Sequence, residues 1–137
     1  MRDIIHSMAV RRAISPVSEA GNTPLVSQII DMQGYASLAF LIATGSLGDA
    51  GAEFTTLVED SDDSAMGGAV PVADAELNGT EAGASFIQSA DDSVFKIGYV
   101  GAKRYVRLTI TPANNGTAAL ISAVAVLAHG AAEPIAQ

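Results

Sequence analysis

Hydrophobic residues beyond position 24 occur in short runs that are bounded by turn-forming residues. Several runs alternate apolar and polar side chains, which is the period of a strand with one buried face. The breaks between them are rich in Gly, Asn and Asp, which tolerate turn geometry. The runs cover residues 25–31, 36–44, 53–59, 84–89, 93–100, 103–111 and 117–130. This pattern predicts an all-β protein in which residues 25–137 form one β-sandwich or jelly-roll-like domain.

The first 24 residues follow a different pattern, and we expect them to lie outside the sandwich. Residues 1–14 show a weak helical spacing of apolar side chains, which a Ser-Pro pair ends. Residues 15–24 are mostly turn formers, so residues 1–24 are predicted to be an extended or short helical arm with a linker. Two interpretations stay open, a frayed terminus and an arm that orders against a neighbouring subunit. On the second one, the contact residues are Ile4, Ile5, Met8, Arg11 and Arg12.

Two consecutive runs, residues 93–100 and 103–111, predict a β-hairpin. Alternation directs Phe95, Ile97 and Tyr99, with Val106, Leu108 and Ile110, toward the core. The opposite face then receives Lys96, Tyr105 and Arg107, with Lys103 at the turn. This basic and aromatic patch has two interpretations. It is a docking surface for an acidic partner, or it is an ordinary sheet face that is either solvated or paired locally with the acidic strand at residues 53–59.

The last run differs from the others because both of its faces are apolar. One face carries Leu120, Val124 and Val126, and the other carries Ile121, Ala123, Ala125 and Leu127. A sandwich core covers only one side of a strand, so a second apolar side is best buried against another subunit. We therefore expect a homo-oligomer, dimer or trimer, formed through Leu120, Val124 and Val126. A buried helix remains an alternative, because periodicity does not separate the two structures in a short apolar run.

Charge is unevenly distributed along this chain of formal net charge −8. Basic residues occur in the first twelve positions and after position 95, while residues 13–95 carry acidic groups and no basic one. Such a body repels phosphate, so we expect no nucleic-acid partner. The longest apolar run, residues 118–128, is shorter than the roughly 20 residues that a membrane-spanning helix needs, so we expect no membrane partner either.

No pattern of catalytic residues is visible. The two histidines, His6 and His129, have no neighbours in sequence that would complete a metal or catalytic cluster. The nucleophile motif GxSxG and the glycine-rich nucleotide motifs are both missing from the sequence. We therefore expect no catalytic residue, no metal ligand and no cofactor, and a protein that is not an enzyme.

The acidic loop at residues 60–68 imitates the start of a calcium-binding loop. Asp60, Asp62 and Ser64 take the first, third and fifth positions. However, Ala65 stands where a helical calcium loop has Gly, and Pro71 where it has a bidentate Glu. A looser Ca²⁺ site in a β loop and a solvated acidic turn both stay open.

Four segments carry a resemblance to a known family. They are "MQGYASLAFLIAT" (32–44), "LVEDSDDSA" (57–65), "IGYVGAKRYVRLTITP" (97–112) and "VLAHGAAEP" (126–134). In this order they resemble the auxiliary capsid proteins, also called decoration or cement proteins, of tailed-bacteriophage head operons. The resemblance covers nearly the whole chain, and its motifs are structural rather than catalytic.

The resemblance implies a virion protein made in the host cytoplasm that binds the outer surface of the icosahedral head. There it would bridge subunits of the major capsid protein and stabilise the shell. Its partners would be the capsid lattice and further copies of itself, and the capsid contacts would be the arm residues together with Lys96, Lys103, Tyr105 and Arg107. Two alternatives stay open. One is another phage structural part, such as a head-completion, tail or fibre-base β-sandwich, and the other is a Ca²⁺-dependent or sugar-binding adhesion module.

Overall fold

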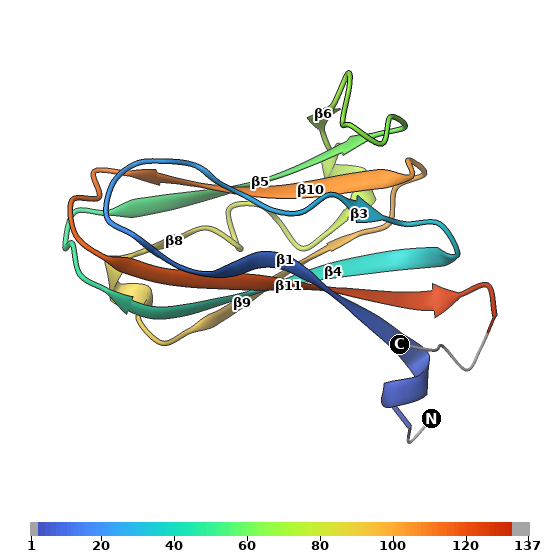
Figure 1. Cartoon of the computed structure of the whole chain (residues 1–137), viewed down its shortest axis with the longest axis horizontal. Coiled ribbons are helices and arrows are strands. Elements are labelled where there is room, and N and C mark those ends of the chain that lie inside the picture. Colours follow the sequence, from blue (N-terminus) through green and yellow to red (C-terminus); the bar gives the residue numbers. More distant parts are fainter. Residues whose placement is uncertain (1–2, 133–137) are drawn as a thin grey trace.

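The chain folds into two antiparallel β-sheets that pack face to face, as Figure 1 shows. The computed structural model describes residues 3–132. In spatial order, sheet A contains β1 (Met8–Glu19), β11 (Ala119–Gly130), β4 (Tyr35–Leu47), β9 (Val94–Tyr99) and β7 (Leu77–Asn78). Sheet B contains β2 (Leu25–Val26), β10 (Tyr105–Ala113), β5 (Glu53–Ser61) and β6 (Val70–Pro71), while β3 (Ile30–Asp31) pairs with β10 and β8 (Phe86–Ile87) with β5. The predicted all-β sandwich is confirmed.

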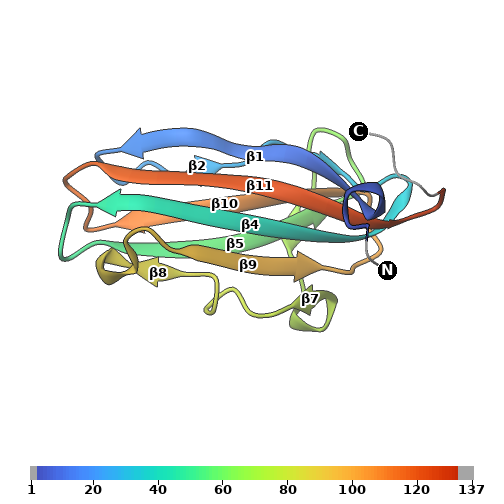
Figure 2. The ribbon, with the colours of Figure 1, turned by 90° about the horizontal axis from the view of Figure 1, so that it is seen from below.

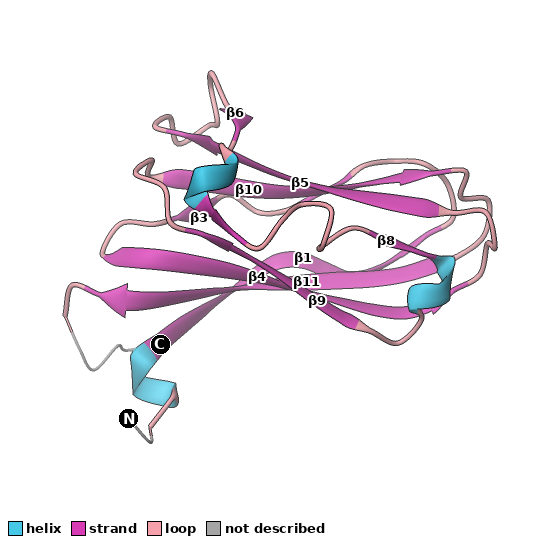
Figure 3. Ribbon diagram, turned by 180° about the vertical axis from the view of Figure 1, so that it is seen from behind, coloured by secondary structure: helices cyan, strands magenta, loops and turns pink. Residues whose placement is uncertain are grey.

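Helical structure among the described residues is confined to single turns, seen in Figure 3. These are the 3₁₀ turns η1 (Ile5–Ser7), η2 (Asp74–Glu76) and η3 (Gln88–Ala90). The last run of the sequence is strand β11 rather than a buried helix. Strand β11 lies between β1 and β4, so it is an interior strand of sheet A.

The core lies between the sheets and is built from the inward positions of each strand. On β10, Val106, Leu108 and Ile110 are fully buried, as their alternation predicts. On β9, Ile97 and Tyr99 are also buried, and Phe95 packs against the core from a half-buried position. The inward face of β11 consists largely of small side chains, so the sheets are joined by a core with few aromatic rings.

The predicted arm differs from the structure, because residues 8–19 are an integral strand. β1 pairs with β11 along its whole length, from Met8 opposite Ala128 to Glu19 opposite Ala119. Its register shifts on either side of Ile14, and Pro16 lies within the second shift. Proline is tolerated at a bulge of an edge strand, because no ladder hydrogen bond is lost there. The prediction of an arm and linker over residues 1–24 is therefore wrong for residues 8–19, and η1 is the short helical part that precedes the sandwich.

The predicted hairpin of β9 and β10 is also wrong. β9 pairs with β4 and β7 in sheet A, whereas β10 pairs with β5, β2 and β3 in sheet B. The connection between β9 and β10 therefore crosses from one sheet to the other. A glycine-containing turn between two strands serves a hairpin and a crossover equally well, and alternation is the same in both. Consequently Lys96 lies on a different sheet from Tyr105 and Arg107.

Candidate interaction surface

The outer face of sheet A carries an apolar strip between two basic residues. Figure 2 shows β1, β11, β4 and β9 of this sheet side by side. Along one row, Arg12 of β1 lies opposite Val124 of β11, Val124 opposite Leu41 of β4, and Leu41 opposite Lys96 of β9. Residues that are directly opposite in antiparallel strands point to the same face. The row therefore has an apolar centre and a cation at each end.

Apolar side chains continue over this face on both sides of the row. Leu120 is 45% exposed, Val124 is 44% exposed and Val94 is 71% exposed. Val10 is exposed as well and lies opposite the half-buried Val126 in the neighbouring row. An uncovered group of large apolar side chains is characteristic of an interaction site. We refer to this surface, defined by Val10, Arg12, Leu41, Val94, Lys96, Leu120, Val124 and Val126, as the outer face of sheet A.

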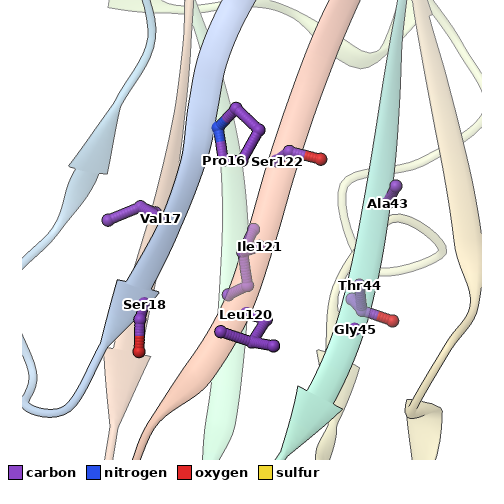
Figure 4. Close-up of a pocket in the computed structure, with 9 residues that line it drawn as sticks. All are labelled: Pro16, Val17, Ser18, Ala43, Thr44, Gly45, Leu120, Ile121 and Ser122. Atoms are coloured by element: carbon purple, nitrogen blue, oxygen red, sulfur yellow. The ribbon is translucent and has the colours of Figure 1, made fainter.

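A hollow of about 360 Å³ lies at one end of this face. Figure 4 shows that its lining comes from three adjacent strands, with Pro16 to Ser18 on β1, Leu120 to Ser122 on β11 and Ala43 to Gly45 on β4. Gly45 lies close under Leu120, because a Cβ atom there would be 3.0 Å from the Leu120 Cβ atom, which is tighter than an ordinary contact. The side chain of Leu120 thus lies over the backbone of β4.

A second hollow, of about 630 Å³, lies on the other side of the row. Its lining includes Ala39 and Gly98, the half-buried Val126, the exposed Lys96, and His129 at the end of β11. The Nδ1 atom of His129 is 2.7 Å from the Ser37 hydroxyl. Both hollows are shallow and mainly apolar at the base, and the row of Val124 and Leu41 runs between them.

The charges on the two sheets differ. Glu19 is the single acidic residue in the strands of sheet A, and its carboxylate accepts a hydrogen bond from the Gly21 backbone at 2.9 Å. The strands of sheet B carry Asp31, Glu53, Glu59 and Asp60. The outer face of sheet A is thus poor in acidic residues in a chain whose net charge is −8.

The two sheets also differ in their ion pairs. Lys103 Nζ is 3.5 Å from Asp60, Arg104 Nε is 2.9 Å from Asp31, and Arg107 Nη2 is 3.0 Å from Glu59. Within residues 3–132, no ion pair joins Arg11, Arg12 or Lys96 to an acidic group. These three residues all lie in strands of sheet A, and Arg12 and Lys96 are at the ends of the apolar row.

The structure brings part of the predicted contact set together and separates the rest. Arg12 and Lys96, expected as capsid contacts, share one face with Leu120, Val124 and Val126, expected as an oligomer interface. The residues expected for capsid binding and those expected for an oligomer interface therefore lie on one surface. Ile4 and Ile5 are exposed at η1, beside the ends of β1 and β11, with Met8 opposite Ala128. Arg11 is exposed along the edge strand and, together with Arg12, lines another hollow that includes Ile30 and Asp31.

The remaining predicted contacts lie elsewhere. Tyr105 and Arg107 are half-buried on β10 of sheet B, and Lys103 precedes that strand. Arg107 pairs with Glu59 on β5, which confirms for this residue the alternative of local pairing with the acidic strand at 53–59. Leu41 and Val94 are contact candidates that the sequence alone does not predict. Both were visible as apolar residues of a strand, but only the strand register places Leu41 between Val124 and Lys96, and Val94 in the neighbouring row opposite Ala43.

Residues suited to chemistry do not gather at one place in the part of the chain that is described. No group of three or more His, Cys, Asp or Glu side chains in that part has the arrangement of a metal site. Asp60, the first residue of the acidic loop, is buried and directed to the Tyr99 hydroxyl rather than to the loop. His6 interacts with Asp3 in the exposed N-terminal turn. No helix among residues 3–132 is both long enough and apolar enough to cross a membrane.

The sequence matches no protein-family model and no curated protein. The fold is similar to that of PBSX exported protein XepA, with a TM-score of 0.59, 10% sequence identity, and coverage of 94% of this chain and 40% of that chain. The chain therefore spans less than half the length of XepA. The xylan-binding CBM22-1 domain of Paenibacillus barcinonensis Xyn10C has a TM-score of 0.44 and 14% identity, covering 92% and 88% of the two chains. SPBc2 prophage-derived protein YomS has a TM-score of 0.44 and 10% identity, covering 86% and 95%.

Proposed function

We propose that this chain is a structural protein of a tailed-phage or prophage particle, and that it acts as a decoration protein on the outside of the icosahedral head. It binds the lattice of major capsid protein and bridges neighbouring subunits, which stabilises the shell. The observation that carries the proposal is the uncovered apolar outer face of sheet A. The protein works by binding other protein chains rather than by catalysing a reaction.

The exposed apolar side chains of that face favour binding to a partner. Removing apolar surface from water contributes about 25 cal/mol per Å². Leu120, Val124 and Val94 are exposed in the isolated chain, so a partner that buries them stabilises the complex. A single face of this size supports only a modest affinity, because association itself is costly. On a particle the same contact is repeated many times, and a copy that touches two capsid subunits gains further by multivalency.

The assignment to a phage particle has two supports. The first is the resemblance of four segments, including residues 97–112, to decoration proteins of head operons. The second is the likeness of the fold to XepA, an exported protein of phage PBSX, which supports the β-sandwich fold. Other phage structural parts use the same kind of sandwich, and copy number separates them. A decoration protein is present over the whole shell, whereas a connector forms a small ring at one vertex.

A sugar-binding module is less well supported by the side chains. Such modules present exposed aromatic rings on which sugar rings stack. The four Phe and three Tyr of this chain all fall within the described residues, and each is buried or half-buried. Stacking platforms of that kind are therefore lacking from residues 3–132.

The test is to purify particles from the strain that carries this gene and to image them by cryo-electron microscopy. We expect β-sandwich density on the outside of the shell, at many equivalent positions, that disappears when the gene is deleted. Complementation with Val124→Asp should leave particles undecorated. Val70→Asp is the matched control, because Val70 is 46% exposed on β6 of sheet B and is similar in size and exposure to Val124. Absence of the protein from intact particles, or a ring of copies at one vertex, would overturn the proposal.

A further inference from the structure

The basic residues at the ends of the apolar row restrict what can cover it. Arg12 and Lys96 lie three strand spacings apart, about 14 Å at 4.7–4.9 Å per spacing. Val124 and Leu41 lie between them. Both basic side chains are exposed, and neither has an ion pair with a described acidic residue. A partner seated on this row would desolvate the apolar centre and bring its own groups up to both cations.

On this basis, and resting on the function proposed above, we propose that the outer face of sheet A binds an acidic surface of a different protein, not a second copy of this chain. The partner places an apolar strip over Val124 and Leu41 and a carboxylate against each of Arg12 and Lys96. In the setting of a phage head this partner is the exposed surface of the major capsid protein. The proposal replaces the expectation of a homo-oligomer through Leu120, Val124 and Val126.

Charge argues against the second copy. A two-fold axis through the middle of the row places Arg12 of one copy against Lys96 of the other, and both pairs are repulsive. Among the described residues, the strands of this face carry no acidic residue near the row that would compensate, because Glu19 lies at the far end of β1 and its carboxylate accepts a hydrogen bond from the Gly21 backbone. Charge repulsion at both ends of a small interface offsets the binding free energy gained by burying apolar surface at its centre.

Charge also argues for an acidic partner. In the described residues Lys103, Arg104 and Arg107 are paired with acidic groups, whereas Arg12 and Lys96 on this face, and Arg11 on the same edge strand, have no ion pair and are left for a partner. The body as a whole repels acidic surfaces, since its net charge is −8. An acidic partner is therefore attracted to the outer face of sheet A and repelled from the rest, which fixes the orientation of docking.

The two hollows give the contact its shape. One lies beside Leu120 and Gly45, and the other beside Val126 and Gly98, so the row is bracketed by depressions of about 360 and 630 Å³. A glycine lies in the lining of each hollow. A Cβ atom at residue 98 would lie 3.0 Å from the Asn78 Cβ atom, just as one at residue 45 would approach Leu120. Two apolar side chains of the partner fit there, one on each side of its contact with Val124.

The experiment uses the full-length chain and shells purified from particles that lack this gene. Binding is measured by co-sedimentation at about 50 mM and about 500 mM NaCl, because salt weakens exposed charge pairs. The double variant Arg12→Gln/Lys96→Gln should bind about tenfold or more weakly at low salt and lose most of the salt dependence. Arg12→Lys/Lys96→Arg, which keeps both charges, should retain most of the affinity.

The matched control for net charge is Val26→Glu/Thr55→Glu, which changes the charge by the same amount at exposed positions of sheet B. We expect its binding to equal that of the wild type within about twofold. Thermal unfolding shows that each variant is folded. Equal binding by Arg12→Gln/Lys96→Gln and wild type overturns the inference while the proposed function stands. Failure of the wild type to bind shells overturns both.

Self-association is the remaining outcome. Sedimentation velocity of the wild-type chain in dilute solution should show a monomer. A dimer that Val124→Asp dissociates and Val70→Asp does not would show that a second copy covers the face, and it would overturn the inference in favour of a homo-oligomer.

Discussion

The Tyr99 hydroxyl donates a hydrogen bond to the Asp60 carboxylate at 2.9 Å, and this contact joins the two sheets inside the sandwich. Tyr99 is on β9 of sheet A and Asp60 is on β5 of sheet B, and both are almost completely buried. Lys103 completes the cluster, because its backbone N–H donates to the Tyr99 hydroxyl at 3.1 Å and its Nζ atom is 3.5 Å from Asp60. The cluster thus fixes the crossover from β9 to β10.

The first prediction concerns Tyr99→Phe, which removes the hydroxyl and leaves Asp60 with one partner fewer. A buried acceptor that loses its donor costs about 1–3 kcal/mol, so the free energy of unfolding should fall by that amount. Urea unfolding followed by circular dichroism measures it. Tyr35→Phe is the control, since Tyr35 is half-buried and its hydroxyl makes no hydrogen bond to the described residues. Equal effects of the two variants would show that the contact between the sheets contributes little.

The second prediction is a loss of stability at alkaline pH. Burial of Tyr99, followed by the hydrogen bond to Asp60 and the charge of that residue, raises the pKa of Tyr99 above its usual value near 10. Above pH 10 the unfolded chain releases this proton while the folded chain retains it. The unfolded state then binds fewer protons, so the free energy of unfolding decreases as pH rises. Urea unfolding between pH 8 and 11 should show this decrease in wild type and a flatter profile in Tyr99→Phe. If stability fell equally with pH in wild type and Tyr99→Phe, the alkaline loss of stability could not be assigned to Tyr99.

The third prediction concerns Gly101, which lies in the crossover between the sheets. A Cβ atom at this position would lie 2.6 Å from the Tyr99 ring, and the ring is held in the core. Gly101→Ala should therefore lower the free energy of unfolding by about 1–3 kcal/mol through overpacking. Gly51→Ala is a suitable control, because the nearest atom there is an Asp49 oxygen at 3.6 Å, an ordinary contact. Equal stability of the two variants would show that the crossover adapts by moving.

The sequence was sufficient for features that depend on alternation within one strand. Val106, Leu108 and Ile110 are in the core as predicted, and the two apolar faces of β11 are real, with Leu120 and Val124 left exposed. Sequence did not determine which strands pair. Lys96 and Arg107 were assigned to one patch because their strands are consecutive, yet they lie in different sheets.

The error at the N-terminus has a local cause. Ser15 and Pro16 break the apolar pattern, and the same residues are compatible with an edge strand that contains a bulge. The burial of Ala9 and Ala13 was not predicted, because alanine indicates core, helix and surface equally. The outer face of sheet A could be identified only from the register, which places Arg12, Val124, Leu41 and Lys96 in one row although they are far apart in sequence.

The last prediction follows from the role of β1 as a strand of sheet A. Deleting residues 1–7 removes only η1 and its exposed Ile4 and Ile5, so the melting temperature should change little. Deleting residues 1–19 also removes Ala9, Ala13 and Ile14 from the core and leaves one side of β11 without hydrogen-bond partners. An unpaired strand of that length is a template for aggregation, so this variant should be destabilised and poorly soluble. Differential scanning calorimetry and size-exclusion chromatography measure both effects. A soluble 20–137 chain with wild-type cooperativity would show that residues 8–19 belong to an arm after all, and that the pairing with β11 is not required for the sandwich.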